Sequence, residues 1–111
     1  MITEAILPDS TTLLAEAFSY CHHLTKVHYP KYAKNVPSSC FINCSHLESF
    51  VLPEGLTHIY SSAFSGATKF NPRFPKSLKS IGSSAFEDTA IDSLILPEGV
   101  SLGGNEFYSC D

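Results

Sequence analysis

Apolar and polar positions follow a pattern that returns every 22 or 23 residues along this chain. Each unit opens with apolar residues spaced three and then two apart and ends at a proline; the clearest copy, LESFVLP, is Leu47–Pro53. Two apolar residues that are two positions apart lie on one face of a β-strand. Proline has no backbone N–H, so it ends the hydrogen bonding of the strand and turns the chain. The pattern predicts short strands that pair in parallel, at about residues 2–7, 24–29, 47–52, 70–74 and 91–96.

The second half of each unit carries one more inward apolar residue and then a phenylalanine, usually preceded by a small residue. The inward residues are Leu13, Val36, Ile59, Ile81 and Leu102, and the phenylalanines are Phe18, Phe41, Phe64, Phe86 and Phe107. We expect this segment and the turn at the phenylalanine to close the side opposite the strands. Phe41, Phe64 and Phe86 should be buried and should touch one another across successive units.

The fourth unit departs from the pattern. Pro72 falls inside its strand and removes a ladder donor, so this strand should be the weakest. Neither Lys69 nor Phe70 matches the first apolar position well, and Phe70 falls in an outward column, where we expect it to be exposed.

A repeat of this length predicts a β-rich solenoid of 22–23-residue coils, because one unit cannot bury its own apolar face and must stack on its neighbours. Residues 1–111 should form a single domain of about four and a half repeats without polar caps. Such a chain is a fragment of a longer array, or a short protein that covers its open ends by self-association.

Composition narrows the possible functions. Apolar residues make up 43% of the chain and charged residues 16%, with a formal net charge of −4. The seven Lys and Arg residues are scattered, which argues against a nucleic-acid surface. No apolar stretch is long enough to span a membrane, and the N-terminal residues MITEAILP lack the features of a signal peptide.

Four cysteines raise the question of a disulfide or a metal site. Cys21, Cys44 and Cys110 share one column, in which other units have Ala67 and Thr89. Cys40 occupies the small position before Phe41. Both columns favour small apolar residues and therefore indicate buried structural thiols. A Cys21–Cys44 disulfide stays open as an alternative, since residues at the same position of adjacent coils lie about 4.8 Å apart. The spacing gives little support to a metal site.

The histidines and serines give no sign of catalysis. His23 and His46 share a column on adjacent units, which fits a solvated turn better than a shared metal. Paired serines precede the Ala-Phe step, where their hydroxyls can bond to the backbone. No Ser–His–acid or Cys–His set and no phosphate loop is found, so we expect neither an enzyme nor a cofactor.

Asn43-Cys44-Ser45 fits the N-glycosylation sequon, which has meaning only in a secreted eukaryotic protein.

The outward strand residues are the candidate binding surface. Exposed Ile6, Val51 and Ile95 flanked by polar side chains resemble a protein-contact patch, although β-branched residues also simply favour strands. The predicted surface comprises Glu4, Ile6, Lys26, His28, Ser49, Val51, Arg73, Asp92 and Ile95.

The full pattern resembles the BspA-type leucine-rich repeat, whose hallmark is close to LPxxLxxIxxxAFxxCxxLxxI. Residues 47–67, LESFVLPEGLTHIYSSAFSGA, and residues 91–110, IDSLILPEGVSLGGNEFYSC, carry the resemblance most fully. It implies a non-enzymatic protein-binding module of a surface-exposed or secreted protein, used in adhesion to host or matrix proteins. The alternatives are a structural spacer or self-assembling segment of a longer array, and an accessory to a catalytic domain elsewhere in a longer chain.

Overall fold

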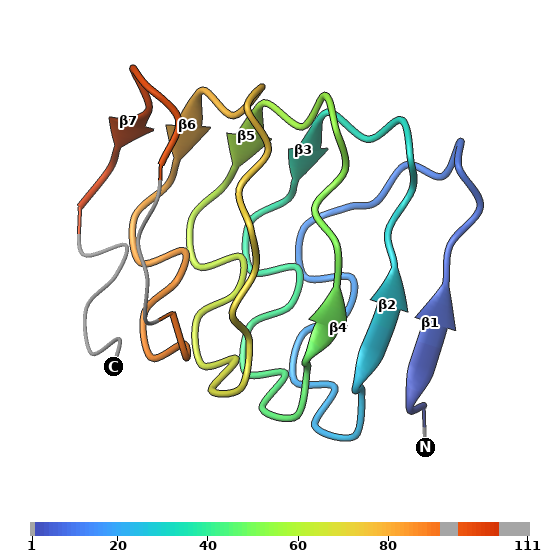
Figure 1. The fold of residues 1–111 in the computed structure, drawn as a ribbon. Helices are drawn as coiled ribbons and strands as arrows, with labels where there is room; N and C mark the ends of the chain where they lie inside the picture. Colours follow the sequence, from blue (N-terminus) through green and yellow to red (C-terminus); the bar gives the residue numbers. More distant parts are fainter. Residues whose placement is uncertain (1, 92–95, 105–111) are drawn as a thin grey trace.

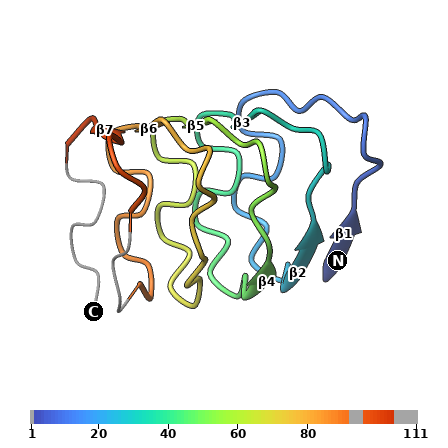
Figure 2. The ribbon, with the colours of Figure 1, turned by 45° about the horizontal axis from the view of Figure 1, so that its top comes forward.

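The structure is a stack of coils, each of which makes one circuit around a common core. The computed structural model describes residues 2–91 and 96–104. Figure 1 shows the coils following one another from the N-terminal side to the C-terminal side, and Figure 2 shows the same stack from a second angle. In the described residues the regular elements are short strands and there is no helix. The strands are β1 (Glu4–Ile6), β2 (Lys26–His28), β3 (Asn35–Val36), β4 (Ser49–Phe50), β5 (His58–Ile59), β6 (Ser80–Ile81) and β7 (Ser101–Leu102).

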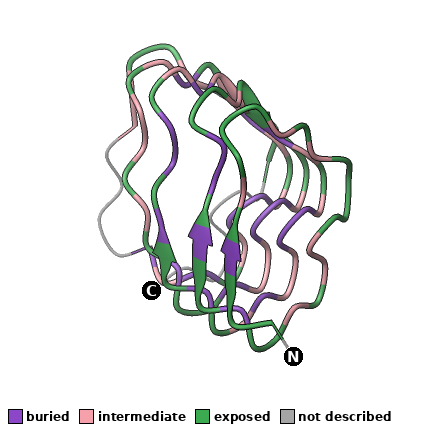
Figure 3. Ribbon diagram, turned by 90° about the vertical axis from the view of Figure 1, so that its right-hand side faces the viewer, coloured by how far each residue is buried: buried purple, intermediate pink, exposed green. Residues whose placement is uncertain are grey.

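The first side of the coils is a parallel sheet of three strands, β1-β2-β4, which we call sheet A. Its register places Ala5 beside Val27, and Val27 beside Phe50. These three side chains point into the core, whereas the residues on either side of them point outward, as Figure 3 shows by burial. The predicted parallel strands at 2–7, 24–29 and 47–52 are confirmed, in shorter form.

In the described residues sheet A stops at β4, since the strand predicted at 70–74 does not form. Residues 92–95 of the strand predicted at 91–96 lie outside the described residues. The segment from Phe70 to Pro75 has six residues, whereas Leu47 to Pro53 has seven. With one residue fewer, the alternation of inward and outward side chains cannot match that of β4, and Pro72 also lacks a donor.

The expectation that Phe70 is exposed was wrong. Its side chain is fully buried, because Phe70 stands 23 residues after Leu47 and occupies the same inward column. Phe70 lies five residues before Pro75, whereas Leu47 lies six before Pro53. Counting back from the proline therefore assigned Phe70 to the outward column next to that of Leu47.

The second side is also a parallel sheet, sheet B, with the order β3-β5-β6-β7. The repeat pattern predicted inward residues in this segment, but it did not predict that successive coils pair here as parallel β-strands. Val36, Ile59 and Ile81 are buried as expected. Leu102 was also expected to face the core, but it is 51% exposed. Leu13, in the first coil, is only partly buried against the core.

The third side is the turn at each phenylalanine, where successive coils are joined by backbone hydrogen bonds. The N–H of Phe18 donates to the carbonyl of Cys40 (2.9 Å), that of Phe41 to Ala63 (2.8 Å) and that of Phe64 to Ala85 (2.8 Å). The residues two before and two after Phe18, Phe41, Phe64 and Phe86 have positive φ. They are Glu16, Tyr20, Ser39, Asn43, Ser62, Gly66, Ser84 and Asp88. Most of these are Ser, Asn, Asp or Gly. Gly and Asn or Asp are the residues that tolerate this backbone best, and a Ser hydroxyl can bond to the nearby backbone.

An aromatic column runs through the core along the stacking axis. Phe18, Phe41, Phe64 and Phe86 stack ring on ring with centroid distances of 5.4, 5.5 and 5.4 Å. Phe41, Phe64 and Phe86 are fully buried, which confirms the prediction. Phe50 meets the rings of Phe41 and Phe64 edge-on, so the column is also joined to the inner face of sheet A.

Candidate functional site

The outer face of sheet A brings six of the nine predicted surface residues together on three adjacent strands. Glu4 and Ile6 lie on β1, Lys26 and His28 on β2, and Ser49 on β4 with Val51 directly after it. The register sets Ile6 beside His28 and Lys26 beside Ser49. These residues are in their outward positions because Ala5, Val27 and Phe50, between them, are held in the core.

A groove of about 680 Å³ runs over this face. Its floor is formed by five of the six residues, Ile6, Lys26, His28, Ser49 and Val51, together with the inward residues Leu7, Val27, Tyr29 and Phe50. Ile6 is 70% exposed and Val51 83% exposed. Two apolar side chains held open to solvent on a paired sheet can be covered by a partner without any loop having to become ordered.

His28 connects the two outward columns of the groove. Its Nε2 lies 3.5 Å from the Oε2 of Glu4, and both side chains are about half exposed. The contact is an ion pair only while His28 is protonated, and at this exposure it contributes little to stability.

The turns after the prolines build the rim of the groove, and their residues were not among the predicted surface residues. Asp9, Lys31, Tyr32 and Glu54 lie there. Tyr32 is 67% exposed, and the Lys31 Nζ lies 5.6 Å from the centroid of its ring. The proline repeat marks these positions in the sequence, because the residue after each proline must start the turn.

Tyr29 closes the groove from below with a buried side chain. Its hydroxyl donates a hydrogen bond to the carbonyl of Asn35 (2.9 Å), and burial raises the pKa of this hydroxyl. The hydroxyl therefore stays protonated and acts as a structural donor rather than as an acid or base.

The other three predicted surface residues do not join the groove in the described part of the chain. Arg73 is exposed, but it lies on the shortened segment after sheet A ends, and it does not line the groove. Asp92 and Ile95 lie outside the described residues.

The cysteines in the described residues, Cys21, Cys40 and Cys44, are free. Cys40 and Cys44 are fully buried, and burial raises the pKa of their thiols to about 12 and about 11. The Cys44 thiol donates to the carbonyl of Phe18 (3.1 Å). Both thiols are therefore protonated packing groups at neutral pH, as the size of their columns indicated. Cys110 lies outside the described residues.

The polar candidates at the turn after Phe41 serve local structure. His46 Nδ1 donates to the carbonyl of His22 (2.6 Å), which joins two successive coils. Asn43 is half-buried, and its side-chain oxygen lies against Gly66, where a Cβ would collide with it. Within residues 2–91 and 96–104, no group of three or more His, Cys, Asp or Glu residues could hold a metal ion.

No helix in the described residues is long and apolar enough to cross a bilayer.

Comparison with known structures supports the fold over nearly the whole chain. A leucine-rich repeat protein from Bacteroides ovatus matches with a TM-score of 0.85 and 28% identity, over 94% of this chain and 30% of its own. A leucine-rich repeat protein of T. pallidum matches with a TM-score of 0.83 and 28% identity, over 97% of this chain and 55% of its own. A leucine-rich cell surface protein from Faecalibacterium prausnitzii matches with a TM-score of 0.65 and 23% identity, over 98% of this chain and 37% of its own, which supports the fold alone.

The chain thus spans between about a third and just over half the length of these structures. None of the curated proteins matches it. The family described as "BspA type Leucine rich repeat region (6 copies)" matches residues 1–111. With its period, its parallel coils and its stacked phenylalanines, this chain belongs to the BspA-type leucine-rich repeat family.

Proposed function

We propose that this chain is a non-enzymatic protein-binding module of a surface or secreted protein, and that it acts in adhesion to a host or matrix protein through the outer face of sheet A. The family is a repeat module of bacterial surface proteins, and its fold is typically non-enzymatic. Contact with a particular partner, and the position of this chain in a longer protein, are parts of the proposal.

The observation that carries the proposal is the pair of open apolar side chains on the groove floor, Ile6 and Val51. Both lie on a sheet whose backbone is already fixed, so a partner that covers them gains from burial at about 25 cal/mol per Å² with little ordering cost on this side. Lys26, His28 and Ser49 between them supply hydrogen-bonding groups that can select a partner.

The experiment is a binding measurement with a panel of immobilised extracellular matrix proteins, using biolayer interferometry. Ile6→Asp combined with Val51→Asp should weaken binding at least about tenfold, because each change places a charge where an apolar contact forms. Leu14→Asp combined with Tyr20→Asp is the matched control, with the same change in net charge. Leu14 is 77% exposed and Tyr20 60% exposed, and neither lines the groove. Equal losses for the control and the groove variant would exclude the groove as the contact surface.

The alternative, a self-assembling segment, is favoured by the outer edge of β1. In the described residues β1 pairs only with β2, and Ile2 beside it is 56% exposed. Unpaired strand edges associate unless they are blocked by charge, proline or a cap, and Glu4 is the one charged residue in β1.

Light scattering across a concentration series tests this alternative. Glu4→Pro should remove association through this edge. The carbonyl of Thr3 accepts from β2, so the alternation of the strand turns the N–H of Glu4 to the outer edge, where proline would remove it. A strictly monomeric particle of 12.1 kDa at high concentration would exclude it.

A further inference from the structure

The residue that follows the proline at each repeat alternates in charge along the whole solenoid. These residues are Asp9, Lys31, Glu54, Lys76 and Glu98, and all five are exposed. The signs run negative, positive, negative, positive, negative, one charge for each coil. We call this row the charge ladder.

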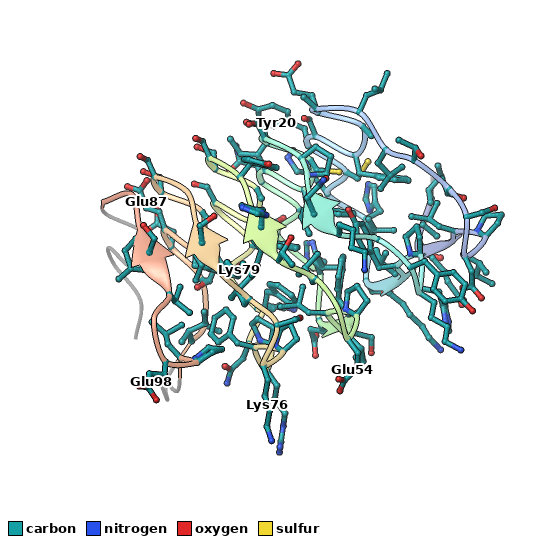
Figure 4. The ribbon with its side chains drawn as sticks, turned by 90° about the horizontal axis from the view of Figure 1, so that it is seen from above. Tyr20, Glu54, Lys76, Lys79, Glu87 and Glu98 are labelled. Atoms are coloured by element: carbon teal, nitrogen blue, oxygen red, sulfur yellow. The ribbon has the colours of Figure 1, made fainter. Side chains whose placement is uncertain are left out.

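Contacts between the turns show that neighbouring members of the ladder lie on successive coils. The backbone N–H of Lys31 lies 3.4 Å from Oδ1 of Asp9. The N–H of Gly55 donates to Oγ of Ser77 (3.0 Å), and this Oγ donates to the carbonyl of Leu56 (2.7 Å), which joins the turns of Glu54 and Lys76. Figure 4 shows Glu54, Lys76 and Glu98 in order along one side of the molecule.

Within one chain the alternation places opposite charges on adjacent coils, which favours stacking slightly, since neighbouring like charges would repel. In the described residues, however, the salt bridge that forms joins His28 to Glu4. The side chains of the ladder therefore do not form ion pairs with one another within the chain. Their charged groups are available to a partner.

An alternating row of this kind is self-complementary. If a second copy is laid antiparallel against the first with a shift of one coil, Asp9 meets Lys76 and Lys31 meets Glu54. By the two-fold symmetry of the arrangement the same two contacts occur again, so all four encounters pair opposite charges. This is the pattern of an isologous interface, in which residue i contacts j and j contacts i.

We propose that the charge ladder is a docking edge for a second copy of this chain, packed antiparallel along the turns after the prolines. Apolar area is present at the same edge, because Tyr32 follows Lys31 and is 67% exposed. The contact shares Asp9, Lys31 and Glu54 with the rim of the groove, whereas Lys76 and Glu98 do not line the groove. It differs from the proposed adhesion surface in its partner and in its extension beyond the groove to Lys76. It also differs from end-to-end association, because it runs along the side of the stack.

The first test compares the self-association of two variants of the 111-residue chain by analytical ultracentrifugation. Lys31→Glu with Lys76→Glu makes the ladder negative throughout and should raise the dissociation constant by about tenfold or more. Lys69→Glu with Lys79→Glu makes the same change in net charge at exposed lysines outside the ladder, and it should change association little. Raising the salt concentration should weaken the wild-type contact, since exposed charges are screened.

The second test exchanges the signs. The fourfold variant Asp9→Lys, Lys31→Glu, Glu54→Lys and Lys76→Glu keeps the net charge, and four-pair complementarity with itself is restored. It should associate with itself like the wild type, because in the same register each of the four encounters again pairs opposite charges.

Three outcomes would overturn the proposal: a wild-type chain that stays monomeric, equal losses in the ladder variant and the matched control, or a sign-exchanged variant that no longer associates with itself. Circular dichroism verifies that each variant keeps its fold. Lys76 does not line the groove, so Lys76→Glu alone should weaken self-association and leave binding to a matrix protein unchanged. Retained matrix binding in this variant separates failure of this proposal from failure of the proposed function.

Discussion

Sheets A and B are built from the same repeat, yet they differ in length and in what they present to solvent. In the described residues sheet A has three strands and ends before the fourth coil, and its outer face carries Ile6 and Val51. Sheet B continues over four strands, and its outward strand residues Asn35, His58, Ser80 and Ser101 are polar. Sheet B can therefore hold successive coils together, while the outer face of sheet A is free to differ from coil to coil.

Truncation of the core that both sheets share should have the largest effect. Phe64→Ala removes a fully buried ring that stacks on Phe41 and Phe86. We expect a loss of about 3–5 kcal/mol in the free energy of unfolding, measured by chemical denaturation, which is a large part of the stability of a small domain. Phe18→Ala, at a half-buried ring in the first coil, should cost less; equal losses would contradict the continuous core.

Sheet B alone should be sensitive to a side chain at Gly82, directly after β6. A Cβ at this position would lie 2.6 Å from the backbone N of Ser61 and 2.9 Å from the carbonyl carbon of Tyr60. Gly82→Ala should therefore cost about 1–3 kcal/mol, the usual range for overpacking. Ser80→Ala, on the outer face of the same strand, should stay within about 0.5 kcal/mol. An equally small loss of stability in Gly82→Ala would contradict the close approach of the coils at this position.

A change in the fourth coil should extend sheet A by one strand. Insertion of one serine after Asn71, together with Pro72→Val, restores the seven-residue spacing and the inward apolar position that β4 has at Phe50. The N–H of Ser49 donates to β2, so that of Phe50 faces the fourth coil. We expect a fourth strand, slower amide exchange at Phe50 and a gain of about 1 kcal/mol from new cross-strand contacts. Pro72→Val without the insertion is the control, because the alternation would remain out of step, and it should not extend the sheet.

At neutral pH the smallest effect concerns the turn that joins the two sheets, because this effect appears only as the pH rises above 9. Burial raises the pKa of Cys40 from an ordinary 9.0 to about 12. The folded state therefore keeps a proton that the unfolded state loses above pH 9. The stability that this thiol contributes is complete below pH 9 and is lost as the pH rises toward 12.

Thermal unfolding between pH 8 and pH 11 measures this loss. Cys40→Ala, which introduces the residue that other coils have at this position (Ala63 and Ala85), should make the alkaline decline shallower. An unchanged decline would assign it to other groups, such as the buried Tyr29 hydroxyl.

The sequence predicted the parts of the fold that depend on regular spacing. The parallel strands of sheet A, the phenylalanine column and the buried small residues all follow from side chains that recur every 22 or 23 residues. What failed was register within one unit: the missing residue between Phe70 and Phe74 cannot be located by counting from the proline alone. Sheet B was not predicted as a ladder because two-residue strands have no alternation to detect.

The candidate site was predicted in part for the same reason. Outward residues such as Ile6 and His28 follow from the alternation of a strand, so their place on one face could be inferred. The groove itself depends on how far the turns at Tyr32 and Glu54 extend past the sheet, and this depends on tertiary packing that a linear pattern does not contain.

The paired left-handed residues around each phenylalanine have a consequence for how such proteins can change in length. From the inward residue of sheet B to the phenylalanine the distance is five residues in every coil, as from Val36 to Phe41 and from Ile59 to Phe64. Between the proline and that inward residue it is five or six. An extra residue at the phenylalanine would displace two backbone conformations at once, whereas one after the proline only enlarges a turn. Grafted peptides should therefore be accepted after the prolines, on the rim of the groove, where new sequence would alter recognition without disturbing the stack.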